Sequence, residues 1–406
     1  MGWKLGLERM RLLSSALGWP QRRFASVHVV GTNGKSSVTR MTAALLEAHG
    51  LAAGACLSPH LRRWSERVLI RGEEIAPRPF ADSVWRTAAA AEAVDGRLEE
   101  GESVTQFEVA TAAAFLALAG AGVEAGVIEA GLGGRLDATN VIPSRVTVLT
   151  SVGLDHTEWL GGTETEIAAE KLAVLRDRTA LVIGSLGEEA TEVALQTAGA
   201  RGARVVRAAP DPGDDIRLAA AGRFQRRNFA LAMAAAGALL GDIDRGLAAE
   251  VAAVLEIEGR LQRVADRPLT LIDAAHNPDG AAALAEALPD LAAGREVVAC
   301  LAVLADKDAE AMAAALAPVL DRVVCAEVEE EALRVSGRPG ARSRPAAELS
   351  EAFASRGVRS EAIPAARGAL VRARSLACER DAVLLVAGSH YLLATARELI
   401  GDRHGG

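Results

Sequence analysis

The stretch His28–Met41, "HVVGTNGKSSVTRM", decides the fold class of the first part of this 406-residue chain. Two valines lead into a glycine turn, which is followed by a lysine, two serines and a helical pattern. Glycines let backbone N–H groups turn toward an anion, and the N-terminus of the following helix adds a positive dipole. The pattern therefore predicts a strand, a phosphate-binding loop and a helix, although the two glycines are closer together than in the standard P-loop.

Short apolar runs alternate with helical stretches along the chain. In the first part the strand-like runs are 26–30, 126–131, 145–153 and 179–185. The pattern restarts with runs at 269–278, 295–304, 321–328 and 381–389, and a final helix is predicted for residues 389–400. Strands alternating with helices are typical of parallel sheets with helices on both faces. We therefore predict an α/β protein with a P-loop-containing parallel-sheet domain and a smaller, Rossmann-like α/β domain.

The length of the chain suggests two domains rather than one core. A charged segment rich in Gly and Arg lies between the two series of strands. We place the boundary there, with residues 1–257 as the ATP-binding domain, 258–265 as a linker and 266–406 as the C-terminal domain. The polar segment 336–345 is predicted to be a loop.

Composition narrows the possible functions. The formal net charge is −8 with no basic block, so nucleic acid is not expected as a partner. The four cysteines are scattered, which disfavours a disulfide framework or a zinc site and indicates buried thiols. The apolar run 109–123 is too short to span a bilayer, and the first residues are charged where a signal peptide would be apolar. We expect a cytoplasmic monomer that does not bind membranes.

Polar side chains gather in four further segments where packing alone does not require them: 56–75, 104–115, 127–141 and 150–172. Glu129 ends one predicted strand, and Asp155 and His156 follow another. Doubly wound sheets bind ligands at the carboxyl ends of their strands. Carboxylate, hydroxyl and imidazole ligands beside phosphates suit Mg²⁺. These segments indicate ATP, more than one Mg²⁺ and an organic substrate held across a domain cleft.

Each segment also has a plainer interpretation. Residues 56–75 fit a charged surface loop, and Glu108 fits a charge at a helix N-terminus. Residues 129–137 fit a tight turn around a salt-bridged Asp137, and a lone histidine such as His156 is more often structural than a metal ligand. Thr163 and Glu166 have the spacing of a capping box that opens a helix carrying Lys171.

Taken in order, these motifs resemble one known family over nearly the whole chain. They are "GTNGKSS", "SPHL", "TQFE", "EAGLGGRLDATN", "LDHTEWLG" with "AAEK", "GRFQRRN", "DAAHNPDGA" and "ADKD". The chain is similar to the bifunctional folylpolyglutamate synthase/dihydrofolate synthase branch of the Mur ligase superfamily. The resemblance implies the Mur ligase architecture and an ATP-dependent amide ligase, which activates the carboxylate of dihydropteroate or a folate as an acyl phosphate and couples it to L-glutamate.

The resemblance also implies roles for individual residues. The ATP contacts implied are Asn33, Gly34, Lys35, Ser36, Ser37, Asn228, Arg260 and Asp273. The implied Mg²⁺ ligands are Ser58, Glu129, His156 and Lys171, the last as a carbamate formed with CO2 that supports the second of two metal ions. Lys35, Lys171 and His156 are the implied catalytic residues. The implied substrate contacts are Lys4, Leu5, Gly6, Leu7, Thr105, Gln106, Phe107, Glu108, Leu136, Asp137, Ala138 and His276.

Four positions depart from the pattern of the family. Ser36 stands where the family usually has Gly, and Ala274 replaces the Gly of "DGAHNP". "EKLAV" replaces "EKAGI" after Lys171, and Lys4 stands where bifunctional members tend to have Asp. These departures concern the phosphate loop, the second-domain motif, the surroundings of Lys171 and the pterin contact, respectively.

Two other functions stay open at this point. A Mur-type ligase acting on a UDP-sugar peptide would share the phosphate loop, but "SPHL" and "TQFE" argue against it. A nucleotide-binding regulatory ATPase without ligase activity should lack the second-domain motif "DAAHNPDG" and the helix with Lys171, and this chain has both.

Overall fold

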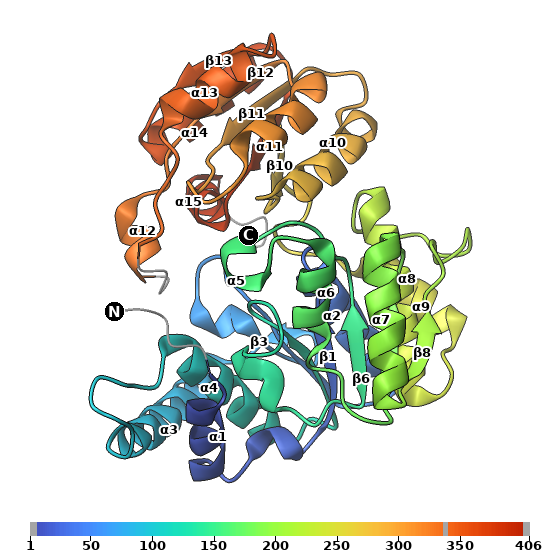
Figure 1. The fold of residues 1–406 in the computed structure, drawn as a ribbon. Coiled ribbons are helices and arrows are strands. Elements are labelled where there is room, and N and C mark those ends of the chain that lie inside the picture. The colour runs from blue at the N-terminus through green and yellow to red at the C-terminus, as the bar shows by residue number, and fades with distance from the viewer. Residues whose placement is uncertain (1–5, 336–339, 401–406) are drawn as a thin grey trace. The chain divides into compact units, whose positions relative to one another are not determined.

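The computed structural model describes residues 6–335 and 340–400. It divides the chain into two compact units. The first unit comprises Met1–Leu218 and Arg226–Leu255, and the second comprises Ala219–Gln225 and Glu256–Gly406. Figure 1 colours the first unit from blue to yellow-green and most of the second from yellow to red. Each unit is described by itself.

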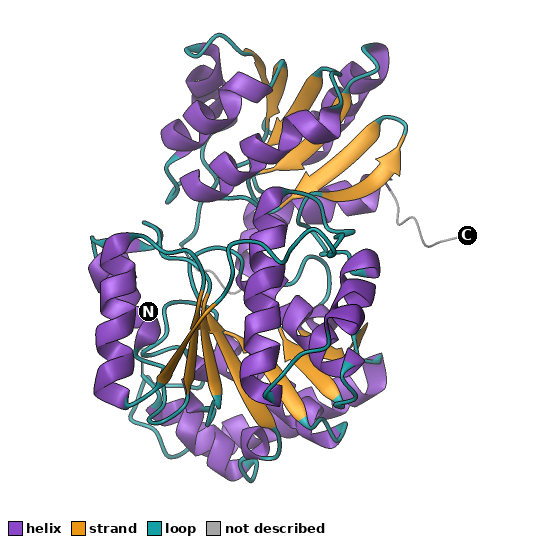
Figure 2. Ribbon diagram, turned by 90° about the vertical axis from the view of Figure 1, so that its right-hand side faces the viewer, coloured by secondary structure: helices purple, strands orange, loops and turns teal. Residues whose placement is uncertain are grey.

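The first unit contains an eight-stranded sheet in the order β4-β3-β2-β5-β1-β6-β7-β8. The six strands from β2 to β8 in this order are parallel, and β3 and β4 form an antiparallel edge. The strands are β1 Ala25–Val30, β2 Ala53–Cys56, β3 Val68–Ile70, β4 Glu73–Glu74, β5 Ala125–Glu129, β6 Val146–Leu149, β7 Ala180–Ile183 and β8 Arg204–Arg207. Figure 2 shows these strands as a twisted sheet with helices on both sides, as expected for a doubly wound fold.

Helices and short 3₁₀ turns fill the connections of this unit. They are α1 Glu8–Ala16, η1 Pro20–Arg22, α2 Lys35–Ala48, η2 Trp64–Arg67, α3 Pro77–Asp95, α4 Gln106–Gly120, η3 Ala138–Val141, α5 Thr157–Leu160, α6 Glu164–Leu172, α7 Glu188–Arg201, α8 Arg223–Leu240 and α9 Arg245–Val254. Helix α8 begins with three residues that belong to the second unit.

Two apolar clusters cover one face of this sheet, and α2 packs on β5 and β2. One cluster joins Phe115 of α4 to Cys56 and Ile128 of the strands, and the other joins α6 and α7 to β1, β6 and β7. The almost wholly apolar sequence of α4 follows from its position, because it also packs against α1 and α3.

The second unit contains a six-stranded sheet in the order β13-β12-β11-β14-β10-β9, in which only β9 is antiparallel to its neighbour. Its strands are β9 Gln262–Asp266, β10 Leu269–Asp273, β11 Val297–Leu301, β12 Arg322–Cys325, β13 Arg359–Ala362 and β14 Val383–Ala387. Its helices are α10 Pro278–Ala292, α11 Ala309–Leu316, η4 Ala317–Val319, α12 Glu330–Val335, α13 Ala346–Ala354, α14 Ala366–Glu379 and α15 His390–Ile400. One core cluster contains apolar residues of α10, α11, α13 and the central strands.

The predicted α/β class and the eight apolar strands agree with this architecture. A β-like run before Ser58 is also visible in the sequence and corresponds to β2. Strands β3, β4, β8, β9 and β13 were not predicted; they are short, and all but β3 carry charged residues. It placed a linker at 258–265, whereas residues 262–265 belong to β9 and the units divide at residue 255. Residues 336–339 of the predicted loop lie outside the described part of the chain.

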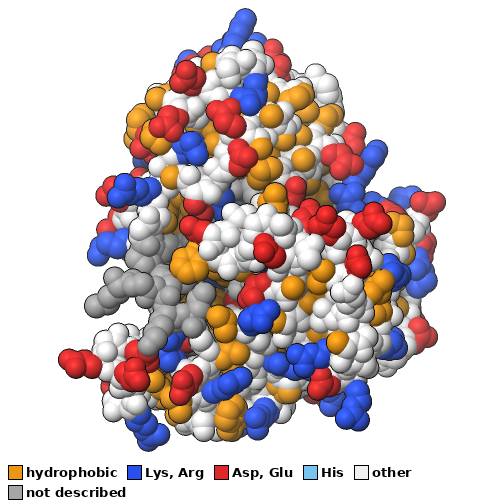
Figure 3. All heavy atoms as spheres, viewed as in Figure 1, with side chains coloured by type: hydrophobic (Ala, Val, Ile, Leu, Met, Phe, Trp, Pro, Cys, Tyr) orange, Lys and Arg blue, Asp and Glu red, His pale blue; other side chains and the backbone are white. Residues whose placement is uncertain are grey.

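The described residues also show the character of the surface and of the cysteines. None of the helices in the described ranges is both long and apolar enough to cross a membrane. On the face drawn in Figure 3, acidic and basic side chains are interspersed with apolar ones. Cys56, Cys300 and Cys325 are buried thiols, but Cys378 is exposed, so the expectation of buried thiols was wrong for Cys378.

Candidate active site

The loops that carry most of the predicted site residues leave the carboxyl edge of the first sheet. Strand β1 lies between β5 and β6, and β2 lies on the other side of β5. The phosphate loop follows β1, Ser58 follows β2, Glu129 ends β5, and His156 follows β6. Since these four strands are parallel, their carboxyl ends meet at one edge of the sheet.

Two glycines of the phosphate loop are required by their surroundings. Gly31 has a φ of 153°, and a Cβ atom there would lie 1.9 Å from Oγ1 of Thr150. Gly34 has a φ of 83°, and its Cβ would lie 2.7 Å from Oδ1 of Asn228. The predicted ATP contact Asn228 therefore lies directly against the loop, although it is almost two hundred residues away in the sequence.

Hydroxyl groups after β6 hold the phosphate loop in place. The Thr150 hydroxyl donates to the carbonyl of Asn33 (2.6 Å), and the Asn33 N–H donates to Oγ of Ser151 (2.8 Å). Thr32 exchanges two hydrogen bonds with Gly153, in which its Oγ1 donates to the Gly153 carbonyl and accepts from the Gly153 N–H. The loop conformation thus depends on the segment that leads to Asp155 and His156.

Glu129 connects two of the predicted metal-binding segments. Its carboxylate is 2% exposed; Oε1 accepts a hydrogen bond from Ser36 Oγ (2.8 Å), and Oε2 accepts one from the Ser58 N–H (2.9 Å). The Ser36 side chain, which stands where the family usually has Gly, therefore contacts the carboxylate of Glu129. The Ser37 hydroxyl is buried and has no hydrogen-bond partner among the described residues.

These residues fit Mg²⁺ bound mainly by substrate. Mg²⁺ keeps several waters and uses one or two carboxylates together with phosphate oxygens. Glu129 supplies one buried carboxylate beside the phosphate loop, and the described ranges contain no cluster of three or more His, Cys, Asp or Glu residues able to form an all-protein metal site. A buried carboxylate beside the phosphate loop suits a cation that is also held by phosphate oxygens.

His156 is positioned by a strained backbone. It caps α5 with a left-handed φ of 52°, and its N–H donates to Oδ1 of Asp155 (2.9 Å). Its ring Nε2 lies 3.9 Å from the same carboxylate. Non-glycine residues in this conformation are uncommon and cluster at functional sites.

Lys171 is a buried cation of the first unit. It is 3% exposed, and its Nζ donates to the carbonyl of Gly31 (3.0 Å). Nζ of Lys35 donates to the same carbonyl (3.0 Å) and to that of Thr32 (3.0 Å). Burial, and then the charge of Lys35, lower the pKa of Lys171 to about 7.

The carboxylates close to Lys171 in the sequence are hydrogen-bonded to other groups. Glu166 accepts from the N–H groups of Gly162 and Thr163 in the predicted capping box, and Glu170 pairs with Arg135 (2.9 Å). A solvated Lys171 paired with Glu166 or Glu170 is therefore not what the structure shows. Near neutral pH a large fraction of Lys171 is the uncharged amine.

A buried ion pair joins helix α1 to Glu108, one of the implied pterin contacts. Arg9 Nε lies 3.1 Å from Oε2 of Glu108, which also accepts the Thr105 N–H (2.7 Å). Glu108 is thus both a capping residue of α4, as the plainer interpretation held, and the partner of Arg9 in α1. The Phe107 ring lies over Gly131, where a Cβ would approach Cζ to 2.4 Å.

The remaining substrate positions differ in exposure. Leu136 is 39% exposed, and Ala138 is buried at the start of η3. Asp137 is buried and hydrogen-bonded within its own loop rather than salt-bridged. Lys4 and Leu5 lie outside the described residues, whereas Gly6 and Leu7 directly precede α1.

The second unit carries the other predicted residues. The Asp273 carboxylate at the end of β10 accepts the N–H groups of Leu261 (2.8 Å) and Ala275 (2.7 Å). Burial raises the pKa of Asp273, and the Arg260 guanidinium opposes that rise. Ala274 has no positive φ, so the usual glycine is not needed there.

His276 follows the same strand. Its Nδ1 donates to the Ala274 carbonyl (2.9 Å), which places the ring hydrogen on that nitrogen. The ring centroid is 5.8 Å from that of His390, which opens α15 after the neighbouring strand β14. The buried Lys307, in "ADKD", follows β11 in the same sheet.

Sequence reasoning missed several of these residues. Thr150 and Ser151 end a predicted strand, so their position after β6 was a usable signal. His390 lies at the start of a predicted helix directly after a strand, and this position was a weaker signal. Arg9 gave no signal, because a single arginine in a short amphipathic helix is ordinary until its buried partner is known.

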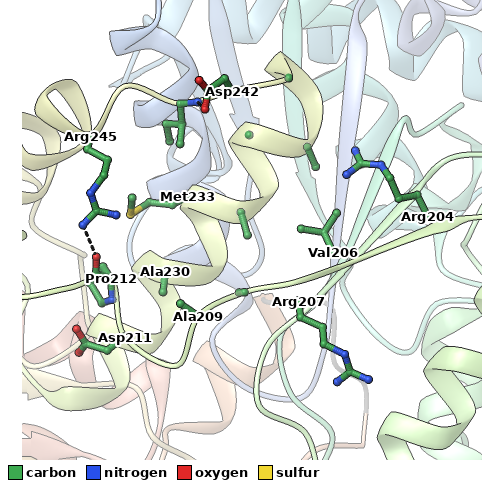
Figure 4. Close-up of a pocket in the computed structure, with 16 residues that line it drawn as sticks. Arg204, Val206, Arg207, Ala209, Asp211, Pro212, Ala230, Met233, Asp242 and Arg245 are labelled. Carbon is green, nitrogen blue, oxygen red and sulfur yellow. Dashed lines mark hydrogen bonds between the residues drawn. The ribbon is translucent and has the colours of Figure 1, made fainter.

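A separate cavity of about 360 Å³ lies between β8 and α8 (Figure 4). Val206 and Met233 line it, and Arg245 at its rim donates to the Pro212 carbonyl (2.8 Å) and pairs with Asp215. None of the predicted site residues is among those that line this cavity.

Comparison with known proteins gives consistent matches. The Mur ligase middle domain family matches residues 29–214, and the Mur ligase glutamate ligase domain family matches residues 259–390. A dihydrofolate synthase/folylpolyglutamate synthase of Mycobacterium tuberculosis is 36% identical over 78% of this chain and 73% of its own length. A folylpolyglutamate synthase of Lacticaseibacillus casei is 32% identical over 97% of this chain and 94% of its own.

Solved structures agree with these relatives. A Mycobacterium tuberculosis folylpolyglutamate synthase complexed with ADP superposes with a TM-score of 0.89 at 34% identity, over 98% of this chain and 96% of that one. A bifunctional folylpolyglutamate synthase/dihydrofolate synthase with Mn, AMPPNP and L-glutamate bound superposes with a TM-score of 0.81 at 27% identity, over 98% and 95% of the two chains.

Proposed function

Because this chain belongs to the folylpolyglutamate synthase/dihydrofolate synthase branch of the Mur ligase family, we propose how its own residues perform ATP-dependent glutamate ligation. The observation that carries the proposal is the meeting of two lysines on one carbonyl of the phosphate loop, beside a buried glutamate. Such an arrangement provides a phosphate site, a metal-binding carboxylate and an amine whose pKa is close to neutral pH.

The reaction needs a carboxylate to be activated, because oxide is a poor leaving group. The γ-phosphoryl group of ATP is transferred to the carboxylate oxygen of dihydropteroate or a folate, which gives an acyl phosphate and ADP. The amine of L-glutamate attacks the acyl carbon, phosphate leaves, and the amine loses a proton as the amide forms. Phosphoryl transfer depends on positioning and electrostatics. We assign Lys35 to the phosphoryl charge and the backbone N–H groups of Asn33–Ser37 to the phosphate oxygens.

Metal binding is assigned to four residues. Glu129, Ser58, His156 and Lys171 would hold the divalent cations, and Mg²⁺ would supply positive charge against the phosphate and carboxylate oxygens. Mn accompanies AMPPNP in one of the related structures, which supports a divalent cation beside nucleotide. Asn228, Arg260 and Asp273 complete the proposed nucleotide contacts.

We further propose that Lys171 is carbamylated. Its neutral amine attacks CO2, a C–N bond forms, and one proton is released, so that the uncharged amine becomes a carbamate anion. The pKa near 7 supports this step because only the unprotonated amine reacts. The carbamate oxygens would provide the ligand for a second Mg²⁺ that a lysine itself cannot provide.

A separate part of the proposal concerns which folate substrates the enzyme accepts. The relative from Mycobacterium tuberculosis carries both activities in its name, and the one from Lacticaseibacillus casei carries folylpolyglutamate synthase alone. We propose that this chain has both activities, with 105–108 and 136–138 at the pterin and His276 beside L-glutamate. A cytoplasmic location and a monomeric state stay predictions from the sequence.

The experiment supplies dihydropteroate and tetrahydrofolate separately, each with ATP, Mg²⁺ and L-glutamate, and identifies the products by mass. We expect one glutamate added to dihydropteroate and further glutamates added to tetrahydrofolate, each with stoichiometric release of ADP. Turnover of tetrahydrofolate alone would show loss of dihydrofolate synthesis and direct attention to Lys4. Turnover of neither, with turnover of a UDP-sugar peptide, would favour the Mur-type alternative.

A further inference from the structure

His28 is a buried polar residue to which the ligase chemistry above gives no role. It lies in β1, three residues before Gly31, with 0% of its surface exposed. Its Nε2 is 2.8 Å from Oγ1 of Thr139. Burial, and to a smaller degree the Arg176 guanidinium, lower the pKa of His28 to about 3, so the ring is neutral and carries one N–H near pH 7.

The other partner of Thr139 determines which ring nitrogen carries that hydrogen. Thr139 Oγ1 lies 2.5 Å from Oδ1 of Asp137, and the Thr139 N–H donates to the same oxygen (2.9 Å). Burial raises the pKa of Asp137, and the hydrogen bonds from Thr139 and Leu132 oppose that rise. The Thr139 hydroxyl donates its hydrogen to Asp137, so it accepts one from His28 Nε2. Nδ1 of His28 is then unprotonated, and it has no partner among the residues that the structure describes.

The far end of this hydrogen-bonded chain is the glycine-rich loop after β5. Asp137 Oδ2 accepts the Leu132 N–H (2.8 Å), so the carboxylate holds the two sides of the loop together. Both of its oxygens are thus occupied by donors of the loop itself. The neighbouring Leu136, in contrast, is 39% exposed and available for contact with a ligand.

We propose that His28 is a positioning residue for the pterin-bearing substrate, which acts through Thr139 and Asp137 to hold the loop 131–138 in its binding conformation. The inference rests on the proposed function, which places 136–138 at that substrate. Strand β1 also leads into the phosphate loop, so the same strand would fix both the loop that holds ATP and the loop that holds the carboxylate to be activated.

A positioning role predicts a different result from a purely structural one. A histidine that only fills the core would, when replaced, lower the free energy of unfolding and the active fraction without changing substrate affinity. A positioning histidine should change the KM of one substrate and not of the other, because ATP contacts a different loop. Replacement by a residue with a donor at the Nε2 position should restore the affinity.

The test compares His28→Leu, which removes the donor, with His28→Gln, whose carboxamide N–H₂ can reach the place of Nε2. We expect His28→Leu to raise the KM for dihydropteroate about five- to tenfold, the size of one buried hydrogen bond, with the KM for ATP within about twofold. His28→Gln should recover most of the loss. Binding of dihydropteroate measured by calorimetry in the presence of ADP and Mg²⁺ should weaken in parallel.

A second pair of variants keeps the proposal testable if His28→Leu does not fold. Thr139→Val removes the bridging hydroxyl and Thr139→Ser retains it, so only Thr139→Val should raise the KM for dihydropteroate. An unchanged KM in folded Thr139→Val and His28→Leu, or an equal rise for ATP, would overturn the positioning role. A wild-type protein that turns over no folate substrate would instead overturn the proposed function on which the inference rests.

Discussion

Lys35 and Lys171 share a single carbonyl acceptor. Two protonated amines so close to one another would repel. Each Nζ lies 3.0 Å from the Gly31 oxygen. Burial of Lys171 disfavours its charged form most, and the nearby charge of Lys35 adds to the effect. The buried Lys171 is the one whose pKa falls to about 7. The two lysines therefore suit different tasks: Lys35 can contact phosphate, and Lys171 is an amine that can be modified.

Replacing Lys35 tests its contact with phosphate. We expect Lys35→Ala to lower ligase turnover by about 10²–10³-fold, the usual loss when an oriented donor at a reacting group is removed. Single-turnover measurement of ADP release would show it. The exposed Arg217, replaced by Ala, serves as the matched control and should change neither turnover nor melting temperature. Turnover close to wild type in Lys35→Ala would contradict the assignment.

Replacing Lys171 tests the carbamate. Lys171→Ala should lose most activity and regain part of it with added formate or acetate, because a small carboxylate can occupy the space that the side chain leaves. In the wild type the neutral fraction of the amine rises as the pH rises through about 7, so bicarbonate-dependent activity should rise in the same range. Activity assays from pH 6 to 8.5 in CO2-free and bicarbonate buffers would measure this. An unmodified lysine in fully active enzyme, by native mass spectrometry, would exclude the carbamate.

At the scale of elements, helix α6 is held against the glycine-rich loop by backbone contact. Gly134 lies so close that a Cβ would be 2.5 Å from the carbonyl oxygen of Lys171 and 2.9 Å from that of Glu170. The Arg135 N–H donates to the Glu170 carbonyl (3.1 Å). The loop that is proposed to hold substrate thus fixes the position of helix α6, which carries Lys171.

This contact predicts that Gly134→Ala displaces α6. Displacement by about 1 Å of a group near the chemistry can cost about 10²-fold in rate, so we expect a loss of turnover together with a lower melting temperature. Gly120→Ala, at the end of α4, is the control: no atom lies within 4 Å of the new Cβ and φ is ordinary, so it should be neutral or slightly stabilising. If Gly134→Ala and Gly120→Ala behave alike, the contact does not position α6.

At the scale of the whole molecule, the proposed nucleotide contacts come from both units. The phosphate loop and Asn228 belong to the first, and Arg260 and Asp273 belong to the second. The second unit holds its pair by local geometry, since Asp273 is fixed by two backbone N–H groups and is near enough to Arg260 for its pKa to respond.

Participation of the second unit is measurable through one arginine. Arg260→Ala should raise the KM for ATP about tenfold, because a hydrogen bond between charged groups contributes about 1.5–3 kcal/mol. Arg263→Ala, which removes an exposed arginine paired with Asp266 three residues away, should leave the KM for ATP unchanged. Equal effects of the two substitutions would remove Arg260 from the nucleotide site.

The sequence alone predicted the local features of this protein. Buried parallel strands appear as continuous apolar runs, and the glycine turn with lysine and serines identifies the phosphate loop, since each depends on neighbouring residues only. The capping box at Thr163 also follows from spacing of three residues, whereas the one at Thr105 was not predicted. Edge strands such as β8 and β13 were missed because their polar residues give no apolar run.

Only the tertiary structure decided what each polar side chain does. Ser36 binds Glu129 across 93 residues of sequence, and Lys171 reaches Gly31 across 140. Burial and neighbouring charge, which set the pKa of Lys171 and the tautomer of His28, arise when distant segments pack together and have no local signal. The sequence therefore predicted which residues carry the chemistry. Packing determined their partners and their pKa values, because hydrogen bonding and desolvation depend on distances in space rather than along the chain.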